Sequence, residues 1–514
     1  MSVLSDIWDL KFYLLAGAIG AIYLYVKLVI FKYFDRRGIP YERPTFPFGN
    51  VSGVFRGKMS IGEACAELYK KHRQSPYFGM FISINPALVI NDPEIIRHVL
   101  TKDFSHFHDR GIYVDEKVDP LSGHLFSLPG EKWKNLRTKL TPTFTSGKIK
   151  QMFPIVNQCG VELGDCVEKV LKIDETVEIK DIVARYTTDV ISSVAFGLET
   201  NSLKEPNNEF RRCGQLVFSS RPLTTLLSLF MPSLLRILKL PNTDTRVTNF
   251  FTKVFSDTVN YRKQNNIKRH DMLNMLMQLM DKGYVETDDA NEIPKGKAVN
   301  DSKKLEMTEA TAQAFVFFVA GFETSSSTVT YCIFEMACHP EIQEKVYKDI
   351  DQALKKHGGL TYDSLAEMEY LSQAVDETLR LYPTLPILNR ECTREYDVPG
   401  TNLHISKGDA IVIPVLGIHK DPNIYPDPEK FDPERFSKEN KGKIHSHAYL
   451  PFGEGPRICI GKRFGLIQAK VALVSLLSRF RFSTNSKTEI PVKHSPGTIV
   501  MCPDHGVNLR VEMR

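Results

Sequence analysis

The apolar positions of this sequence fall first into one long run near the N-terminus. Residues 12–31, FYLLAGAIGAIYLYVKLVIF, are apolar except for Lys27, and about 20 such residues cross a bilayer as a helix. A cleaved signal peptide has a basic leader and a small-residue cleavage site, whereas Asp6 and Asp9 precede this run. The pattern therefore predicts a transmembrane anchor over 12–31.

Positive charge collects at the end of this run and just behind it, at Lys27, Lys32, Arg36 and Arg37. By the positive-inside rule, residues 1–11 are lumenal and the chain after the anchor is cytosolic. Three prolines stiffen residues 32–50 and prevent the anchor helix from continuing, so we expect a hinge there. The remaining residues, 51–514, are expected to form one catalytic domain.

Within this domain the pattern is mainly helical with small pieces of sheet. Long helical patterns occupy most of residues 150–380. Residues 77–92 predict two short strands that turn at Asn85-Pro86, and residues 396–415 predict further short strands. The polar segment 286–304 suits either a linker or a long surface loop. The fold class expected is mainly α with small β-sheets.

Composition narrows the function classes. The chain has 514 residues, 42% hydrophobic and 25% charged, as ordinary folded proteins do. Its net charge of +5 is spread through the sequence and gives no support for a nucleic-acid partner. Nine cysteines without a CxxC pair argue against a disulfide framework or a structural zinc site. The domain is therefore expected in a reducing compartment.

One cysteine stands in an unusual loop, PFGEGPRICIG, at residues 451–461. A helical pattern follows Gly461, so Cys459 lies near a helix N-terminus, where free N–H groups stabilise a thiolate. Gly455 and Gly461 are expected to let the backbone pass close to something flat, and Arg457 offers a fork for a carboxylate. A haem supplies both an iron and propionates. The alternative is a buried, inert cysteine.

The spacing of this loop resembles a known family. The residues Phe452, Gly455, Arg457, Cys459 and Gly461 match the FxxGxRxCxG haem-binding loop of the cytochromes P450, the haem-thiolate monooxygenases. Further signatures follow in family order: WKNLR from 133, AGFET from 320, ETLR from 377 and FDPERF from 431. The resemblance covers essentially the whole chain, and it is strongest to the insect microsomal family 6 branch associated with detoxification.

The resemblance implies a haem b cofactor with Cys459 as the iron ligand. The residues expected to hold this cofactor are Trp133, Arg137, Arg390, Arg457, Phe452 and Gly461. Trp133 and Arg137 lie one helical turn apart and so point the same way, which suits a shared propionate.

Helical spacing also puts Glu377 and Arg380 on one face of a helix that Pro383 stops. In the family, the matching residues form a buried network with the arginine of the PERF segment, here Arg435. We therefore expect Glu377, Arg380 and Arg435 to serve structure and haem incorporation.

The segment 315–332 is apolar on all sides and predicts a buried helix. Ala320 and Gly321 are expected to clear space against the cofactor. Resemblance makes Glu323 and Thr324 the catalytic acid–alcohol pair that supplies protons while O2 is activated. The alternative for Thr324 is a buried threonine bonded back to the preceding turn.

The resemblance also implies a pocket for a lipophilic substrate, because its expected lining is aromatic and aliphatic. The lining residues expected are Leu125, Phe126, Phe317, Ala320, Ile387 and Ile499.

The activity implied is insertion of one oxygen atom from O2 into a lipophilic molecule at the cytosolic face of the endoplasmic reticulum membrane. Electrons would come from NADPH through NADPH–cytochrome P450 reductase, with cytochrome b5 as a second candidate partner. Five basic residues are expected to form the docking face: Lys132, Lys134, Lys139, Lys462 and Arg463. Two alternatives stay open: a haem-thiolate isomerase that needs no reductase, whose members often lack the acid–alcohol pair, and a non-catalytic haem sensor.

Overall fold

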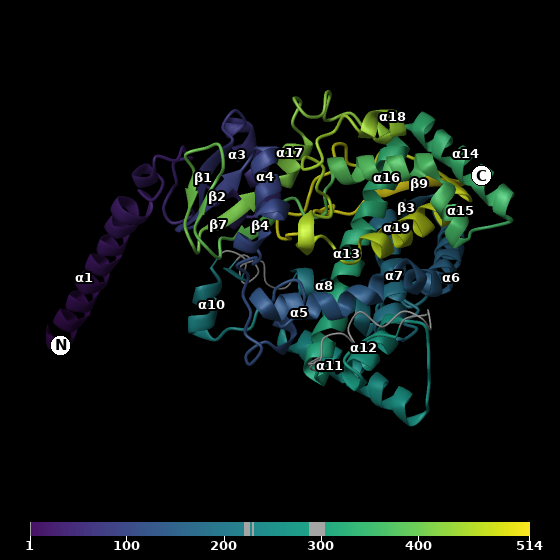
Figure 1. Ribbon diagram of the computed structural model, residues 1–514, viewed down its shortest axis with the longest axis horizontal. Coiled ribbons are helices and arrows are strands. Elements are labelled where there is room, and N and C mark those ends of the chain that lie inside the picture. The colour runs from purple at the N-terminus through teal and green to yellow at the C-terminus, as the bar shows by residue number, and fades with distance from the viewer. Residues whose placement is uncertain (1, 220–226, 229–230, 287–303) are drawn as a thin grey trace.

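The computed structural model describes residues 2–219, 227–228, 231–286 and 304–514 (Figure 1). The predicted linker or loop over 286–304 lies almost wholly outside the described residues. Helices dominate the part that is described, which confirms the expected fold class. The helices are α1 (Ser2–Tyr25), α2 (Ser52–Phe55), α3 (Ile61–His72), α4 (Pro93–Arg97), α5 (Gly130–Leu140), α6 (Ser146–Leu171), α7 (Ile179–Ile191), α8 (Glu209–Ser219), α10 (Pro232–Leu238), α11 (Thr245–Gln264), α12 (Met272–Asp281), α13 (Met307–Cys338), α14 (Pro340–His357), α15 (Tyr362–Glu367), α16 (Glu369–Leu381), α17 (Val415–His419), α18 (Lys438–Lys441) and α19 (Lys462–Leu477).

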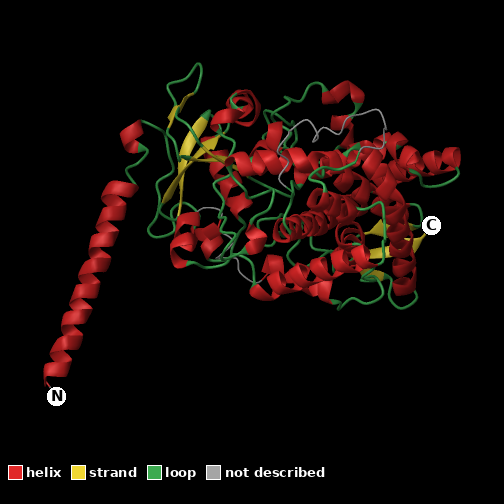
Figure 2. Cartoon of the chain, turned by 60° about the horizontal axis from the view of Figure 1, so that its bottom comes forward, coloured by secondary structure: helices red, strands yellow, loops and turns green. Residues whose placement is uncertain are grey.

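The strands gather at two ends of the domain, beside α1 and near the C-terminus (Figure 2). A four-stranded sheet has the order β1-β2-β7-β4, a three-stranded sheet the order β3-β9-β8, and β5 pairs with β6. The strands are β1 (Tyr77–Ile82), β2 (Asn85–Ile90), β3 (Thr176–Glu178), β4 (Leu388–Glu391), β5 (Tyr396–Asp397), β6 (His404–Ile405), β7 (Ala410–Ile413), β8 (Phe480–Ser483) and β9 (Asn508–Met513).

The first hairpin corrects one prediction. Its turn lies at Ser83 and Ile84, whereas Asn85 and Pro86 already belong to β2 and pair with Ile82 and Phe81 of β1. Ser83 takes the left-handed conformation, with φ of +55°, and so turns the chain before the proline is reached. The short strands expected over 396–415 are present as β5, β6 and β7.

The N-terminal helix α1 stands away from the domain (Figures 1 and 2). Residues 11–37 form a helix long and apolar enough to cross a membrane, and its most apolar 18-residue window has a mean hydropathy of 2.1 and little burial. Large apolar side chains such as Phe12 and Leu15 are exposed along it. At the C-terminal end of this helix, Phe31 and Phe34 are buried in the cluster that contains Phe81, so the helix joins the domain directly at this end.

Helix α13 runs through the centre of the domain (Figure 1). Its N-terminus carries a capping box made by Glu306 and Glu309. A Cβ at Gly321 would lie 2.4 Å from the Ile191 side chain, so the glycine allows α7 to approach α13 closely. The expectation that Gly321 clears space for a cofactor is therefore corrected: its missing side chain makes room for α7.

Candidate functional site

Cys459 lies between a single helical turn at Gly455–Arg457 and the start of α19 at Lys462. Its N–H donates to the Phe452 carbonyl at 2.9 Å, and the Gly461 N–H reaches its sulfur. The Cys459 side chain is accessible, but it lies deep within the domain, and desolvation there raises the pKa of its thiol more than the Gly461 N–H and Arg137 lower it. The loop therefore favours a protonated thiol until a metal takes the place of the proton.

Two glycines of this loop, Gly455 and Gly461, differ in what lies beside them. Gly455 has a φ of +74°, and a Cβ there would lie 1.8 Å from the Leu100 carbonyl oxygen. It is thus required for close contact with protein backbone, which corrects the expectation of contact with a flat ligand. A Cβ at Gly461 would meet no described protein atom closer than the Phe144 ring, at 3.8 Å, so space is open at this position.

Four buried or half-buried arginines gather beside this loop. Arg457 lies with its guanidinium 4.1 Å from the Trp133 ring and donates to the carbonyls of His108 and Leu128 at 2.6 and 2.8 Å. Arg137 donates to the Ile458 carbonyl at 2.9 Å. The arginines of this group, here called the arginine cluster, are Arg110, Arg137, Arg390 and Arg457.

The arginine cluster holds more positive charge than its surroundings compensate. Burial and the neighbouring guanidiniums lower the pKa of Arg457 to about 9 and that of Arg390 far below its usual value. Asp109 offers a carboxylate to Arg457 at 3.6 Å. Among the described residues, the buried Nε atoms of Arg110 and Arg390 find no hydrogen-bond partner. Such unpaired donors are costly, and a bound dianion would satisfy them.

This excess charge would suit the propionates of a haem whose iron Cys459 would bind. Arg110 belongs to this group, although the sequence patterns did not indicate it. Its guanidinium lies 4.0 Å from the Phe126 ring and its Nη2 reaches the Arg457 carbonyl at 3.4 Å. Arg110 stands in the short stretch HDRG, residues 108–111, which has no helical pattern and lies outside the matched motifs. Its contact with Arg457 therefore could not be predicted from the sequence.

One face of α13 borders an internal space. Most of this helix is buried, yet Ala320 is exposed, and Val316, Val319 and Thr324 are partly exposed. Val316, Ala320 and Thr324 follow one another at intervals of four residues, and Val319 lies three after Val316, so the four positions share a face. An exposed stripe in the middle of a core helix requires an opening beside it that is wide enough for solvent. Val316 and Val319 were not among the residues expected to line the pocket.

Contacts between distant segments close a ring around this space. Leu125 donates its N–H to Gln313 of α13 at 2.9 Å, and the next residue, Phe126, contacts Arg110. On the other side, Ser325 of α13 contacts Gln468 of α19 at 3.4 Å. The thiol loop, the arginine cluster and the stripe of α13 therefore surround one region of the domain.

The other residues expected to line the substrate pocket are mostly buried in the protein. Phe317 is buried, and its ring packs edge-on against Phe144 at 5.3 Å. Ile387 is buried in the cluster that contains Val412. Ile499 is partly exposed, and it precedes the buried Val500. Leu125 is buried directly beside the ring of contacts.

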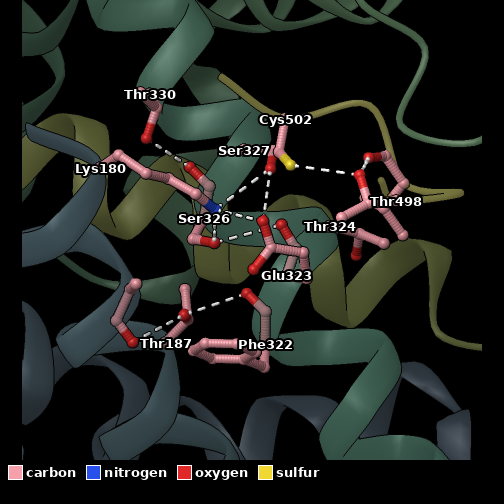
Figure 3. Close-up of polar contacts among 12 residues, drawn as sticks. Lys180, Thr187, Phe322, Glu323, Thr324, Ser326, Ser327, Thr330, Thr498 and Cys502 are labelled. Carbon is pink, nitrogen blue, oxygen red and sulfur yellow. Dashed lines mark hydrogen bonds and ion pairs between the residues drawn. The ribbon is translucent and has the colours of Figure 1, made fainter. Parts of the chain in front are cut away.

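Glu323 and Thr324 leave α13 in different directions (Figure 3). The Thr324 hydroxyl lies on the stripe and donates to the Ala320 carbonyl at 2.5 Å, which is the back-bonded geometry considered as the alternative. The Glu323 carboxylate points toward α7, where it accepts from Lys180 at 2.6 Å. The structure therefore places the alcohol at the internal space and the acid behind it.

Glu377 and Arg380 form a fully buried, two-pronged ion pair on α16, with distances of 2.7 and 2.8 Å. Arg435 lies 3.4 Å from the same carboxylate, and the Asp432 N–H donates to it at 2.9 Å. Arg380 also donates to the His419 carbonyl at 2.9 Å. The three residues that the sequence grouped as a network are thus brought together.

Comparison with known proteins shows the family of this chain. The family model described as Cytochrome P450 matches residues 39–510. "Probable cytochrome P450 6a14" of Drosophila melanogaster is 44% identical over 97% of this chain and 98% of its own length. "Cytochrome P450 6k1" of Blattella germanica is 41% identical over 96% of this chain and 95% of its own length. The chain therefore belongs to the cytochrome P450 family, the haem-thiolate monooxygenases that insert one oxygen atom from O2 into lipophilic molecules with electrons from NADPH.

Proposed function

We propose that this monooxygenase is anchored in the endoplasmic reticulum membrane and oxidises lipophilic xenobiotics, such as plant toxins or insecticides, on the cytosolic side. The observation that carries the site assignment is the uncompensated arginine cluster beside the accessible Cys459 thiol. The likeness to the insect relatives named "Probable cytochrome P450 6a14" and "Cytochrome P450 6k1" supports membership in the family 6 branch that the sequence resembles, which is associated with detoxification. Aliphatic side chains along the stripe of α13 suit an apolar substrate.

Each residue then has a separate task. Cys459 would bind the iron, and Arg110, Arg390 and Trp133 would hold the propionates, while Phe452 and Gly461 shape the loop around them. Haem, when bound, supplies the iron that binds and activates O2. Ala320 leaves room on the stripe of α13, and the Thr324 hydroxyl holds an ordered water that carries protons into the internal space. Glu323, on the side of α13 that faces α7, supplies protons to this water.

The electron donor we propose is NADPH–cytochrome P450 reductase, with cytochrome b5 as a second donor. Lys462 and Arg463 are exposed beside the thiol loop, with the Lys462 ammonium 5.4 Å from the centre of the Phe452 ring. Lys132 and Lys134 are exposed on α5, whose Arg137 contacts the same loop. Exposed charges of this kind mainly raise the rate of association with an acidic partner.

Replacing Thr324 by alanine tests the proton role. Thr324→Ala should keep haem binding and NADPH consumption, because Cys459 and the arginine cluster are unchanged. Product should fall and hydrogen peroxide should rise, and both are measured per NADPH consumed. Thr311→Ala is the matched control, since this buried α13 threonine also bonds back to the preceding turn, at 2.7 Å. Full coupling in Thr324→Ala would reject the role.

A further inference from the structure

Two tyrosines stack in parallel where α13 packs against the end of α16. The ring centroids of Tyr331 on α13 and Tyr382, directly after α16, are 4.2 Å apart, and the ring planes differ by only 2°. Aromatic pairs in proteins usually have centroids about 4.5–7 Å apart, often in edge-on arrangements. These two rings therefore overlap more closely than usual, and such overlap lets an electron pass from one ring to the other.

The tyrosine pair lies at the C-terminal end of the stripe of α13. Tyr331 follows Thr324 by seven residues, which is close to two helical turns, so both residues project from the same face. The rise between them along the helix is about 10 Å. Tyr331 is fully buried, whereas Tyr382 is partly exposed. The pair thus leads from the neighbourhood of the internal space toward the surface.

Each phenol of this pair has a proton acceptor of its own. The Tyr382 hydroxyl donates to the Glu335 carboxylate at 2.5 Å, and the Tyr331 hydroxyl oxygen is 2.8 Å from Nδ1 of His494. Burial lowers the pKa of His494 to about 4, so its ring is neutral near pH 7 and can accept a proton. Both distances are short enough for proton transfer.

A tyrosine that only fills a core does not require such partners. Tyr186 on α7 is also fully buried, and its hydroxyl donates to the backbone carbonyl of Gln468 at 2.9 Å. An oxidised phenol is a strong acid, so a tyrosine gives up an electron readily only where a base takes its proton in the same step. Tyr331 and Tyr382 meet this condition, and burial raises the pKa of both, which keeps them protonated beforehand.

We infer that Tyr331 and Tyr382 form an electron relay that removes oxidising equivalents from the haem site when no substrate consumes them. Tyr331 gives one electron to the haem site and its phenol proton to His494, which leaves a neutral phenoxyl radical. Tyr382 then gives an electron to Tyr331 and its own proton to Glu335, while His494 returns its proton. A soluble thiolate finally gives an electron to Tyr382, Glu335 returns the proton, and two of the resulting thiyl radicals join as a disulfide.

The relay is a protective function beyond the oxidation of substrates, and it rests on the proposed haem site beside the stripe of α13. The two proposals fail in different ways. A wild-type protein without the red-shifted carbon monoxide band of thiolate ligation would overturn both. A protein that has this band but forms no tyrosyl radical would overturn the relay alone.

Electron paramagnetic resonance tests the relay without product formation. The ferric haem protein, free of substrate, is mixed with peracetic acid and freeze-quenched. The wild type should give the signal of a tyrosyl radical, which narrows when the protein contains ring-deuterated tyrosine. Tyr331→Phe should lose most of this signal, because Tyr382 is then no longer oxidised. Tyr382→Phe should keep the radical on Tyr331, and added thiol should no longer shorten its lifetime.

Tyr186→Phe is the matched control, because it also removes the hydroxyl of a fully buried tyrosine, and it should give the wild-type signal. His494→Gln should lower the yield of the radical, since the amide of glutamine does not take up a proton. The carbon monoxide spectrum of each variant confirms that it is folded and holds haem. An unchanged signal in Tyr331→Phe, or an equal loss in Tyr186→Phe, would overturn the inference.

Bleaching of the haem during turnover without substrate tests the protective role. With reductase and NADPH present, the haem absorbance should decay several-fold faster in Tyr331→Phe and in Tyr382→Phe than in the wild type. Added thiol should slow the decay only where both tyrosines are present, and Tyr186→Phe should decay like the wild type. Equal rates of decay in all of these proteins would overturn the relay.

Discussion

The Glu377–Arg380 pair and the arginine cluster hold their buried charges in opposite ways. The Arg380 guanidinium meets the Glu377 carboxylate through two hydrogen bonds, and both side chains are fully buried. In the arginine cluster, Arg390 is also buried, yet its Nε has no partner among the described residues. Its neighbours there are other cations, which lower its pKa.

This contrast separates buried charges that stabilise the fold from buried charges that can bind a ligand. A buried charge without a partner costs several kcal/mol, so folded proteins rarely retain one without a reason. The Glu377–Arg380 pair is complete in the protein alone. The arginine cluster becomes complete only with an added anion, and the adjacent thiol indicates that this anion belongs to a metal cofactor.

The largest effect is expected from breaking the complete pair. Glu377→Gln would strand the buried Arg380 charge and should lower the free energy of unfolding by about 3–5 kcal/mol. Urea titration of the purified protein measures this change. The exposed pair of Lys438 and Glu369 gives the control, because Lys438→Ala should change stability by less than about 1 kcal/mol. Equal effects in both variants would remove the contrast.

Substitution in the arginine cluster should affect the cofactor more than the fold. Arg390→Met would remove a charge-assisted bond worth about 1.5–3 kcal/mol and so weaken haem retention about 10–100-fold. The rate of haem transfer to an excess of apomyoglobin measures this loss. The exposed Arg394→Met is the control and should retain haem like the wild type. A lower urea midpoint with unchanged haem retention would assign Arg390 to structure instead.

Acid should lower the free energy of unfolding through His419, whose carbonyl accepts from the Arg380 partner of Glu377. Burial and the nearby Arg380 lower the pKa of His419 to about 3, from an ordinary value of 6.5. Between these values the unfolded chain binds a proton that the folded chain does not, so stability is lost as pH falls below about 6.5. At pH 5 this loss is about 2 kcal/mol. Urea titrations at pH 7 and 5 should show it, and His419→Gln should reduce it.

The sequence predicted the elements whose residues lie close together along the chain. The apolar run follows from its length, the helix after Gly461 from its apolar pattern, and the pairing of Glu377 with Arg380 from their helical spacing. The hairpin turn was misplaced by two residues because the Asn-Pro pair is a strong turn signal, while the chain turns at Ser83 through a left-handed residue.

Contacts between distant segments could not be predicted in the same way. Lys180 lies 143 positions before Glu323, and no spacing rule connects them. The direction of Glu323 was missed for the same reason, since AGFET does not reveal which neighbour its acid faces. The sequence predicted that Gly321 and Gly455 lie close to a cofactor. The close neighbours are instead the Ile191 side chain at Gly321 and the Leu100 carbonyl at Gly455.

The central claim is that Cys459 binds the iron of a haem held beside the arginine cluster. The spectrum of the reduced protein with carbon monoxide tests it most directly, because thiolate ligation shifts the main haem absorption band strongly to the red. The wild-type protein should show this band, and Cys459→His should lose it while Cys502→Ser, a substitution of a buried cysteine, retains it. An unchanged spectrum in Cys459→His would contradict the account.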